Sequence, residues 1–428
     1  MHAAWVCERA DGKFSTATSA TSSVRGDPDE WYGRFLGVGN GALGGCRHIM
    51  QRFHFATVGS SNGHDGNTGP AFLGNEEVLN EFAFRSIHVE AVIGKRIVAQ
   101  YYGRPHVKSY YIGCSTGGRQ GTQTALKYPE NFDVIMAGAP ATDWNHLVHW
   151  GGTLSCYVGA PDPDSSPAFI APDLWNVRRS WTSAIGLTVP DACEFRPETL
   201  MCSGDEKDQC LIRPQTAALH KIYSPLYLDG KLIYPRFYPG AEGISSALFS
   251  RQLSAYTAVH IYWLKYAVLA RSELDFNEYG PQYKRLMDEV NPGGIPTTCP
   301  RSTTPTTAAL IRHVKLIILI ASGNSKRVYD LVAGTLGPAS IDALYRLFLV
   351  PRMGHCEDGP GAARFGQLGG QSAVNARTNN VLLALVDWVE GGVALDTIIG
   401  TATDGATRLH CRYPQRIVWD DSGLGCEA

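Results

Sequence analysis

The stretch that most constrains this chain is a strand, a tight turn and a helix in immediate succession. The apolar run at Tyr110–Ile112 predicts a buried strand, the pentapeptide Gly-Cys-Ser-Thr-Gly follows at 113–117, and a helical run begins at Gln120. A serine between small residues can lie on a sharp strand-to-helix turn, with its hydroxyl exposed beside the helix N-terminus. Gly-x-Ser-x-Gly by itself is common and can mark a glycine-rich turn with an incidental serine. The flanking strand and helix favour Ser115 as a nucleophile.

Strands and helices alternate around this turn. A strand beginning at Arg34 is predicted to run into a glycine-rich loop, further strands are predicted at 53–59 and 134–137, and apolar residues at helical spacing predict a helix over 83–102. Such an alternation is typical of a parallel sheet covered on both faces. We therefore place the chain in the α/β class and assign residues 1–141 to the front half of an α/β-hydrolase-like core.

The glycine-rich loop after the first strand, Gly39–Ala42, carries few side chains. Backbone N–H groups of such a loop can approach a ligand closely, so Gly41 or Ala42 could donate one arm of an oxyanion hole and Thr116 the other. A plain turn explains the same glycines equally well.

The alternation stops between residues 142 and 312, a segment rich in aromatic residues, proline and cysteine. We expect a large inserted lid domain there, with most aromatic side chains in a second core. As a group they suit an insertion over a pocket for a flat, aromatic substrate. Strand-like runs return at Lys315–Ile320 and Leu344–Val350, and an amphipathic helix is predicted over Asn375–Val389. Residues 313–428 are therefore assigned to the back half of the core.

His355 follows a late strand and precedes a Gly/Pro-rich loop, which is the place of the triad histidine in an α/β-hydrolase. A lone histidine at a strand end is more often a capping or surface residue. Here, however, Ser115 and His355 are each next to a cysteine. If both side chains converge on one reacting centre, Cys114 and Cys356 converge as well. A disulfide between them would then join the two loops, with a stabilisation on the order of 5 kcal/mol.

Composition restricts the partners of the chain. Its 428 residues are 44% hydrophobic and 18% charged, with a formal net charge of -2, which predicts a soluble globular protein of more than one domain. The sequence has no long Lys/Arg run and no apolar run of about 20 residues, so neither nucleic acid nor a membrane is expected as a partner. The start of the chain, Met1–Arg25, carries charges and no apolar stretch, so we do not expect it to be a signal peptide.

The 11 cysteines indicate an oxidising compartment instead. Cys202 with Cys210 and Cys411 with Cys426 flank short polar segments, which is typical of small disulfide loops. A zinc site would need Cys-x2-Cys or His-x3-His spacing, and the sequence has neither. We expect a secreted protein, because a gene model lacking its 5′ end would account for both the cysteines and the missing signal.

Four motifs together resemble the tannase and feruloyl esterase family of secreted, mainly fungal and bacterial enzymes. They are Gly-Cys-Ser-Thr-Gly-Gly-Arg-Gln-Gly at 113–121, Met-Gly-His-Cys at 353–356, Gly-Arg-Phe-Leu-Gly-Val-Gly-Asn-Gly at 33–41 and Phe-Asp-Val-Ile-Met-Ala-Gly-Ala-Pro-Ala at 132–141. The similarity covers about residues 28–428, and the pairing of Cys-Ser with His-Cys is specific to the family. It implies an α/β-hydrolase core with a large lid, Ser115 as nucleophile, His355 as base and a Cys114–Cys356 bond.

The sequence departs from the family pattern at two places. The family carries its triad acid in a loop of the type His-Gly-x-x-Asp-Pro, where this chain reads Ala-Ser-Gly-Asn-Ser-Lys at 321–326. Asn324 lies nearest the expected position, and Asp330, the nearest carboxylate, is the candidate acid. The family also carries an Asp-rich calcium loop after Asp-Ala-Cys, whereas Cys193 here runs directly into Glu194. Because calcium commonly needs six to eight oxygen ligands, we expect the ion to be lost and predict no metal and no cofactor.

The resemblance therefore implies a serine-type carboxylic ester hydrolase for feruloyl, hydroxycinnamoyl or galloyl esters, small phenolic substrates of plant cell-wall or tannin origin. An acyl-enzyme mechanism is expected, with activity reduced by the altered acid loop. The alternative is an inactive relative that keeps the pocket and binds phenolic or carbohydrate ligands. The oligomeric state is not predicted by any of these features.

Overall fold

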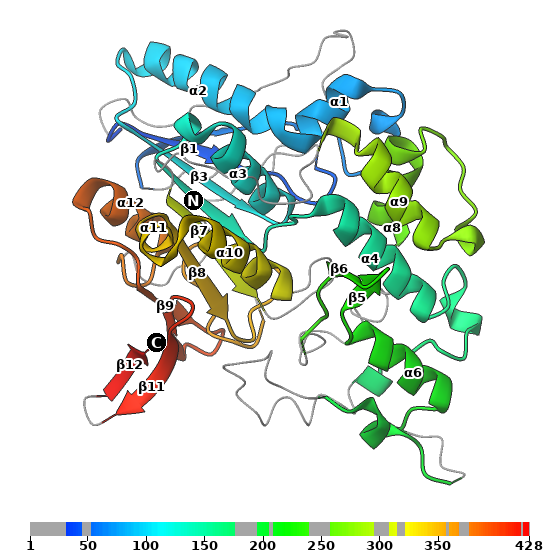
Figure 1. Ribbon diagram of the computed structural model, residues 1–428. Helices are drawn as coiled ribbons and strands as arrows, with labels where there is room; N and C mark the ends of the chain where they lie inside the picture. Colours follow the sequence, from blue (N-terminus) through cyan, green and yellow to red (C-terminus); the bar gives the residue numbers. More distant parts are fainter. Residues whose placement is uncertain are drawn as a thin grey trace.

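A six-stranded parallel β-sheet forms the centre of the molecule (Figure 1). The computed structural model describes residues 31–44, 53–175, 195–204, 209–238, 257–294, 308–314, 322–356, 359–367, 376–420 and 423–427. The strands are β1 (Arg34–Val38), β2 (Phe55–Gly59), β3 (Lys108–Cys114), β4 (Val134–Gly138), β7 (Ala308–Val314) and β8 (Tyr345–Val350), in the order β2-β1-β3-β4-β7-β8. Every neighbouring pair in the sheet is parallel, so the predicted α/β class is confirmed.

Both faces of this sheet are buried in a hydrophobic core. Successive side chains of a strand point to opposite sides, so each strand contributes to both cores. Tyr110 and Ile112 of β3 lie in one core with helix α12 (Val381–Gly391). Tyr111, between them in sequence, lies in the other core. The helices that contribute to this second core are α2 (Ser86–Tyr102), α3 (Thr116–Lys127), α10 (Ser322–Leu336) and α11 (Pro338–Leu344).

The helix predicted over 83–102 starts as a π-helix, Glu81–Arg85, and continues as α2 until Gly103 takes a left-handed φ of 67°. The last predicted helix begins later than expected. Asn380 caps α12 by accepting hydrogen bonds from the N–H groups of Leu382 and Leu383. The cap side chain, which the apolar periodicity does not register, therefore sets this boundary.

The strand between β4 and β8 is β7, which ends at Val314. The strand predicted at Lys315–Ile320 lies outside the described residues. Residues 308–320 are mostly apolar, with Arg312, His313 and Lys315 between two apolar segments, and such a composition does not reveal which of the residues pair with the sheet.

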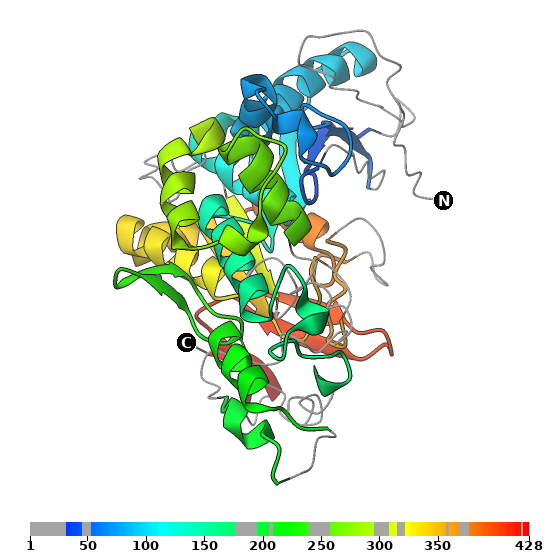
Figure 2. The same ribbon diagram turned by 90° about the vertical axis from the view of Figure 1, so that its right-hand side faces the viewer.

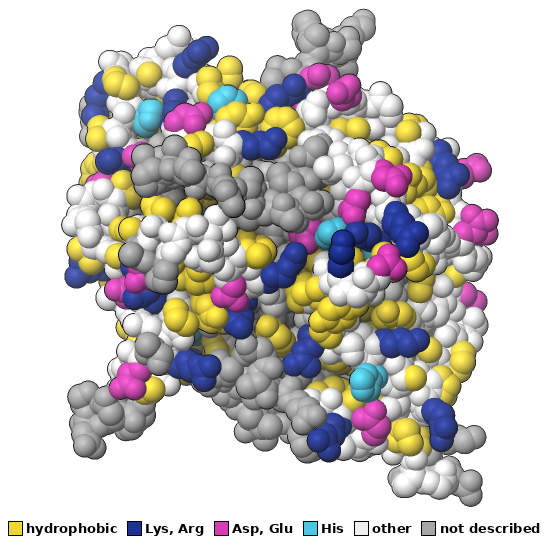
Figure 3. Space-filling model, viewed as in Figure 1, with side chains coloured by type: hydrophobic (Ala, Val, Ile, Leu, Met, Phe, Trp, Pro, Cys, Tyr) yellow, Lys and Arg dark blue, Asp and Glu magenta, His cyan; other side chains and the backbone are white. Residues whose placement is uncertain are grey.

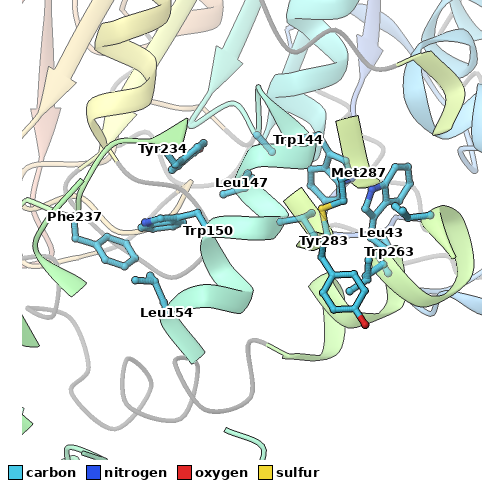
Figure 4. Close-up of a cluster of buried hydrophobic side chains, with 14 of the residues drawn as sticks. Leu43, Trp144, Leu147, Trp150, Leu154, Tyr234, Phe237, Trp263, Tyr283 and Met287 are labelled. Carbon is cyan, nitrogen blue, oxygen red and sulfur yellow. The ribbon is translucent and has the colours of Figure 1, made fainter. Parts of the chain in front are cut away.

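The described part of the segment between β4 and β7, where a lid domain is predicted, is mainly helical. Its larger elements are α4 (Trp144–Tyr157), α6 (Arg213–Ile222), the antiparallel pair β5 (Leu226–Leu228) and β6 (Lys231–Tyr234), α8 (Thr257–Tyr262), the π-helix Trp263–Val268 and α9 (Pro281–Val290). In Figure 4, Trp150 lies between Tyr234 and Phe237, and the ring centroids are 5.0 and 4.7 Å away. The predicted aromatic core is present, although Tyr227 is 57% exposed.

This aromatic core is shared with the front half of the chain. Leu43 and Phe72 belong to the same buried cluster as Trp150 and Trp263. In both views of the ribbon, α6 lies at the opposite end of the molecule from α2 (Figures 1 and 2). The insertion is therefore anchored beside the sheet and extends away from it.

The remaining elements are short. They are α1 (Glu76–Asn80), the 3-10 turns Pro70–Phe72, Pro129–Asn131, Pro163–Ser165, Pro197–Leu200, Phe276–Glu278 and Pro292–Gly294, and the strands β9 (Thr397–Thr401), β10 (Thr407–Cys411), β11 (Arg416–Asp420) and β12 (Gly423–Glu427). None of the helices that the structure describes has the length and apolar character needed to cross a membrane. On the face in Figure 3, acidic and basic side chains are interspersed.

Both predicted small disulfide loops are present. Cys202 is bonded to Cys210, and Cys411 at the end of β10 is bonded to Cys426 in β12. These bonds close short loops, so each stabilises its own neighbourhood.

Candidate active site

Ser115 lies at the junction of β3 and α3, as the sequence predicts. Its φ of 62° and ψ of -117° form a sharp turn that residues with side chains rarely adopt. A Cβ on Gly117 would lie 2.8 Å from Asn40 O, and one on Gly118 would lie 2.4 Å from Gly138 O. Since any larger residue would collide with backbone, these glycines allow the turn to pack against its neighbours.

Three backbone hydrogen bonds hold Ser115 in this conformation. Its N–H donates to Gly138 O at 2.9 Å, and its carbonyl accepts from the N–H groups of Arg119 and Ala141 at 3.0 Å each. The segment after β4 therefore supports the elbow from one side. A strained backbone persists only where surrounding structure fixes it in this way.

His355 lies in the loop after β8, and a disulfide ties this loop to the elbow. Cys114 and Cys356 are bonded, with their Cα atoms 5.8 Å apart, so the predicted bond is present. Ser115 and His355 are each one residue from this covalent link. Between their own side chains the described structure has no hydrogen bond. Such bonds are commonly long in unliganded enzymes and tighten when substrate is bound.

Burial lowers the pKa of His355 to about 4. The imidazole is therefore neutral at pH 5 and above. A general base must be unprotonated before it can accept a proton. His355 consequently has the protonation state that a base needs over the weakly acidic and neutral range.

The two predicted oxyanion arms lie side by side. Gly117 N–H donates to Asn40 O at 2.7 Å, and the Thr116 hydroxyl donates to Ala42 O. Within the described part of the chain, the N–H groups of Thr116 and Gly41 have no hydrogen-bond acceptor. A Cβ on Gly41 would meet no described atom within 4 Å. The structure thus leaves room beside Gly41 and two backbone donors available close to Ser115.

Known proteins with similar sequences identify the family. The sequence model of "Tannase and feruloyl esterase" matches residues 25–266 and 319–428. This chain belongs to the tannase and feruloyl esterase family. A probable feruloyl esterase B-1 of Aspergillus flavus is 36% identical over 444 residues, which covers 96% of this chain and 83% of that protein. A probable feruloyl esterase B-2 of Aspergillus terreus is 35% identical with the same coverage.

Solved structures agree with this assignment. Feruloyl esterase B from Aspergillus oryzae is 32% identical and superposes with a TM-score of 0.85, covering 93% of this chain and 85% of that one. The tannin acyl hydrolase from Aspergillus niger is 21% identical with a TM-score of 0.71, over 94% of this chain and 82% of that one, and shares the fold. The family predicted from the motifs is confirmed. The chain is accordingly a carboxylic ester hydrolase with an α/β-hydrolase-like fold.

The candidate acid of this esterase, Asp330, points elsewhere in the structure. It is exposed on α10, where its carboxylate accepts a hydrogen bond from the Tyr413 hydroxyl at 3.3 Å. No hydrogen bond between Asp330 and His355 is present among the described residues. The role of Asp330 stays a prediction, and residues 315–321, just before α10, lie outside the described structure.

Asn324 is fully buried at the start of α10. Its amide N–H groups donate to the carbonyl and hydroxyl oxygens of Thr142, at 3.3 and 3.1 Å. Its amide oxygen accepts from Arg327 Nη1 at 3.0 Å. Both ends of the amide therefore have partners within this small cluster.

The predicted loss of the calcium loop after Cys193 falls in residues 176–194, which the structure does not describe. Within the described ranges, no group of three or more His, Cys, Asp or Glu side chains is placed to hold a metal ion.

Cys156 is a free, half-buried cysteine. Burial raises the pKa of its thiol to about 11, so the thiol stays protonated and unreactive at neutral pH.

Sequence reasoning missed an ion network beside the site. Asp143, buried at the start of α4, lies 3.1 Å from Arg327 Nη1 and 2.9 Å from His146 Nδ1. His146 Nε2 lies 3.1 Å from an Asp288 oxygen on α9. The network connects the inserted segment to α10. Asp143 and His146 are three residues apart, but Arg327 and Asp288 are far from them in sequence and share no motif with them, so no local pattern indicates these contacts.

A second missed group lies behind the glycine-rich loop. Glu90 has no exposed surface and accepts a hydrogen bond from Val38 N–H at 3.0 Å. Burial raises the pKa of this carboxyl well above its usual range. The signal was present in the sequence, because Glu90 stands on the apolar face of the predicted helix between Ile87 and Ala91.

Proposed function

We propose that this chain hydrolyses esters of phenolic acids, with Ser115 as nucleophile and His355 as general base. The observation that carries the proposal is the Cys114–Cys356 bond, which holds a strained serine and a half-buried, neutral histidine on adjoining loops. The substrate class is supported by relatives named as feruloyl esterases.

In this mechanism, His355 takes the proton of the Ser115 hydroxyl as its oxygen attacks the ester carbonyl. The tetrahedral oxyanion accepts hydrogen bonds from the N–H groups of Thr116 and Gly41. The alkoxide leaves with the proton from His355, and the acyl group stays on Ser115. Water then attacks the acyl-enzyme with His355 as base, releasing the carboxylic acid and restoring the serine.

Hydrolysis of methyl ferulate, methyl gallate and the aliphatic ester methyl hexanoate tests the proposal. The phenolic esters are expected to be cleaved faster than the aliphatic one, and a fluorophosphonate is expected to label Ser115. Binding of ferulate without turnover and without labelling would instead identify an inactive relative that keeps the pocket.

We also propose that turnover is limited because His355 has no carboxylate partner to orient it. Support comes from the hydrogen bonds of the two candidates, since Asp330 pairs with Tyr413 and the Asn324 amide is bonded to Thr142 and Arg327. A histidine without a carboxylate partner is oriented less well, and the imidazolium that forms during the reaction is less stable.

The pH dependence of kcat/KM distinguishes a His355 that has a carboxylate partner from one that has none. Because the pKa of His355 is lowered to about 4, kcat/KM is expected to fall tenfold per pH unit below about pH 4. A carboxylate beside the imidazole favours its charged form and would move this limb toward pH 6.5 or above. Asp330→Ala is expected to stay within about twofold of the parent, and Asn324→Asp to bring no gain. Loss of turnover in Asp330→Ala would establish Asp330 as the acid.

We propose that the protein acts outside the cell. The three disulfides among the described residues are of the kind that persist in oxidising compartments. Non-reducing peptide mapping of protein made by a secreting host is expected to recover all three linked peptide pairs. Free thiols at these six positions in such protein would contradict the proposal.

A further inference from the structure

We propose that Gln120 is a positioning residue, which fixes the oxyanion loop (Gly39–Ala42) relative to Ser115 through a two-bond amide clamp to Asn40. The inference rests on the proposed function. The two residues of the amide clamp come from different elements: Asn40 follows β1, and Gln120 is on α3, the helix that begins next to Ser115.

The amide clamp is reciprocal. Asn40 N–H donates to Gln120 Oε1 at 3.0 Å, and Gln120 Nε2 donates to Asn40 Oδ1, also at 3.0 Å. Both side chains are buried, with exposed fractions of 3% and 2%. A buried donor or acceptor left without its hydrogen-bond partner costs about 1–3 kcal/mol. The pair therefore strongly favours one arrangement of loop and helix.

The rest of the loop is tied to the same helix and strand. Asn40 O accepts from Gly117 N–H at 2.7 Å, and Gly39 N–H donates to Ile112 O at 3.0 Å. Gly41, the next residue, has open space beside it. The loop is therefore fixed up to the residue before Gly41, whose N–H has no acceptor among the described residues.

A second layer of polar groups holds the amide clamp from behind. Gln120 Nε2 also donates to Asn62 Oδ1 at 3.1 Å, which accepts from the Ser86 hydroxyl at 2.8 Å. Asn40 Nδ2 donates to Ser60 O at 2.7 Å. The ends of β2 and α2 thus orient both amides, and neither amide can rotate without breaking several buried hydrogen bonds.

The consequence for catalysis follows from the geometry of an oxyanion hole. The N–H groups of Thr116 and Gly41 must both lie about 2.7–3.1 Å from one oxygen, whose negative charge develops only in the transition state. A shift of the loop by about 1 Å would misplace one donor, and loss of one donor costs about 10²–10³ in kcat. Because Gln120 is buried, we expect no contact between its side chain and substrate, and KM should change little.

Gln120→Met tests the proposal, and Gln123→Met is its matched control. Gln123 is also a buried glutamine of α3, and it has no hydrogen bond to the oxyanion loop. Gln120→Met is expected to lower kcat about 100-fold with KM within about threefold of the parent, whereas Gln123→Met keeps kcat within about threefold. Equal losses in the two variants, or a loss carried by KM, would overturn the proposal.

Gln120→Glu provides a second readout if the methionine variant does not fold. An ionised carboxylate cannot donate to Asn40 Oδ1, but a protonated one accepts and donates as the amide does. Burial raises a carboxyl pKa, so the ratio of variant to parent kcat is expected to rise between pH 7 and pH 5. Taking the ratio removes the effect of groups that titrate alike in both proteins, among them Glu90, which bonds Val38 N–H, His64, which bonds Asn62 O, and Tyr111, whose hydroxyl donates to Gly117 O. A ratio that does not change with pH would contradict the amide clamp.

Fluorophosphonate labelling separates this proposal from the proposed function, because it requires Ser115 and the oxyanion donors but no ester turnover. If the parent is labelled yet cleaves no phenolic ester, the proposed function fails. The amide clamp then stands if Gln120→Met is labelled about 100-fold more slowly than Gln123→Met. Equal labelling rates in the two variants, or no labelling of the parent, would overturn the amide clamp.

Discussion

Ester hydrolysis by Ser115→Ala is expected to fall by a factor of about 10⁴–10⁶ in kcat, to the residual rate that binding and the oxyanion donors provide alone. Without the hydroxyl no acyl-enzyme can form, and His355 could at best activate a poorly held water. Folding should change little, because the Ser115 side chain has no hydrogen-bond partner among the described residues. Single-turnover kinetics with methyl ferulate and a thermal melt of the same sample would measure both effects.

Ser155→Ala is a suitable control for this experiment. Ser155 is buried on α4, and its hydroxyl donates to Gly151 O at 3.3 Å. Its removal should affect stability by about 1 kcal/mol and leave kcat near that of the parent. A Ser115→Ala variant that kept a tenth of the parent rate, or that was still labelled by fluorophosphonate at the same peptide, would exclude Ser115 as the nucleophile.

Removal of the Cys114–Cys356 bond is expected to cause the largest loss of stability. The bond joins residues 242 apart in sequence, for which the chain-entropy model gives a stabilisation of about 5.5 kcal/mol. The double variant Cys114→Ala/Cys356→Ala should therefore melt at a much lower temperature. It should also lose kcat in the protein that remains folded, because the His355 loop is no longer joined to the elbow.

The Cys202–Cys210 bond provides the comparison. It spans a separation of 8, for which the same model gives about 2.5 kcal/mol. Cys202→Ala/Cys210→Ala should accordingly lower the melting temperature less and leave kcat unchanged at temperatures where the protein is folded. If both double variants lost stability equally and kept full activity, the Cys114–Cys356 bond would have no special role in holding the two loops together.

Features encoded by neighbouring residues could be predicted from the sequence. The elbow needs an apolar strand, small residues around Ser115 and a helix, and all three stand within residues 110–128. The Cys114–Cys356 bond could be predicted although it spans most of the chain, because each cysteine adjoins a candidate residue of the same reacting centre. Most strands and helices of the core were predicted for the same reason, since a periodicity of two or 3.6 is a local property.

The tertiary structure decided features that depend on contacts between distant residues. Periodicity could not choose the paired segment within the mostly apolar residues 308–320, since pairing with β4 and β8 sets it. Asp330 was the nearest carboxylate in sequence, yet its position on α10 directs it to Tyr413. The hydrogen bond between Asn40 and Gln120 joins residues 80 apart. Nothing in the sequence around either residue distinguishes it from an ordinary polar residue. Local propensity fixes which elements form, whereas buried polar groups acquire their partners only when those elements pack, because each must replace the hydrogen bonds it loses from water.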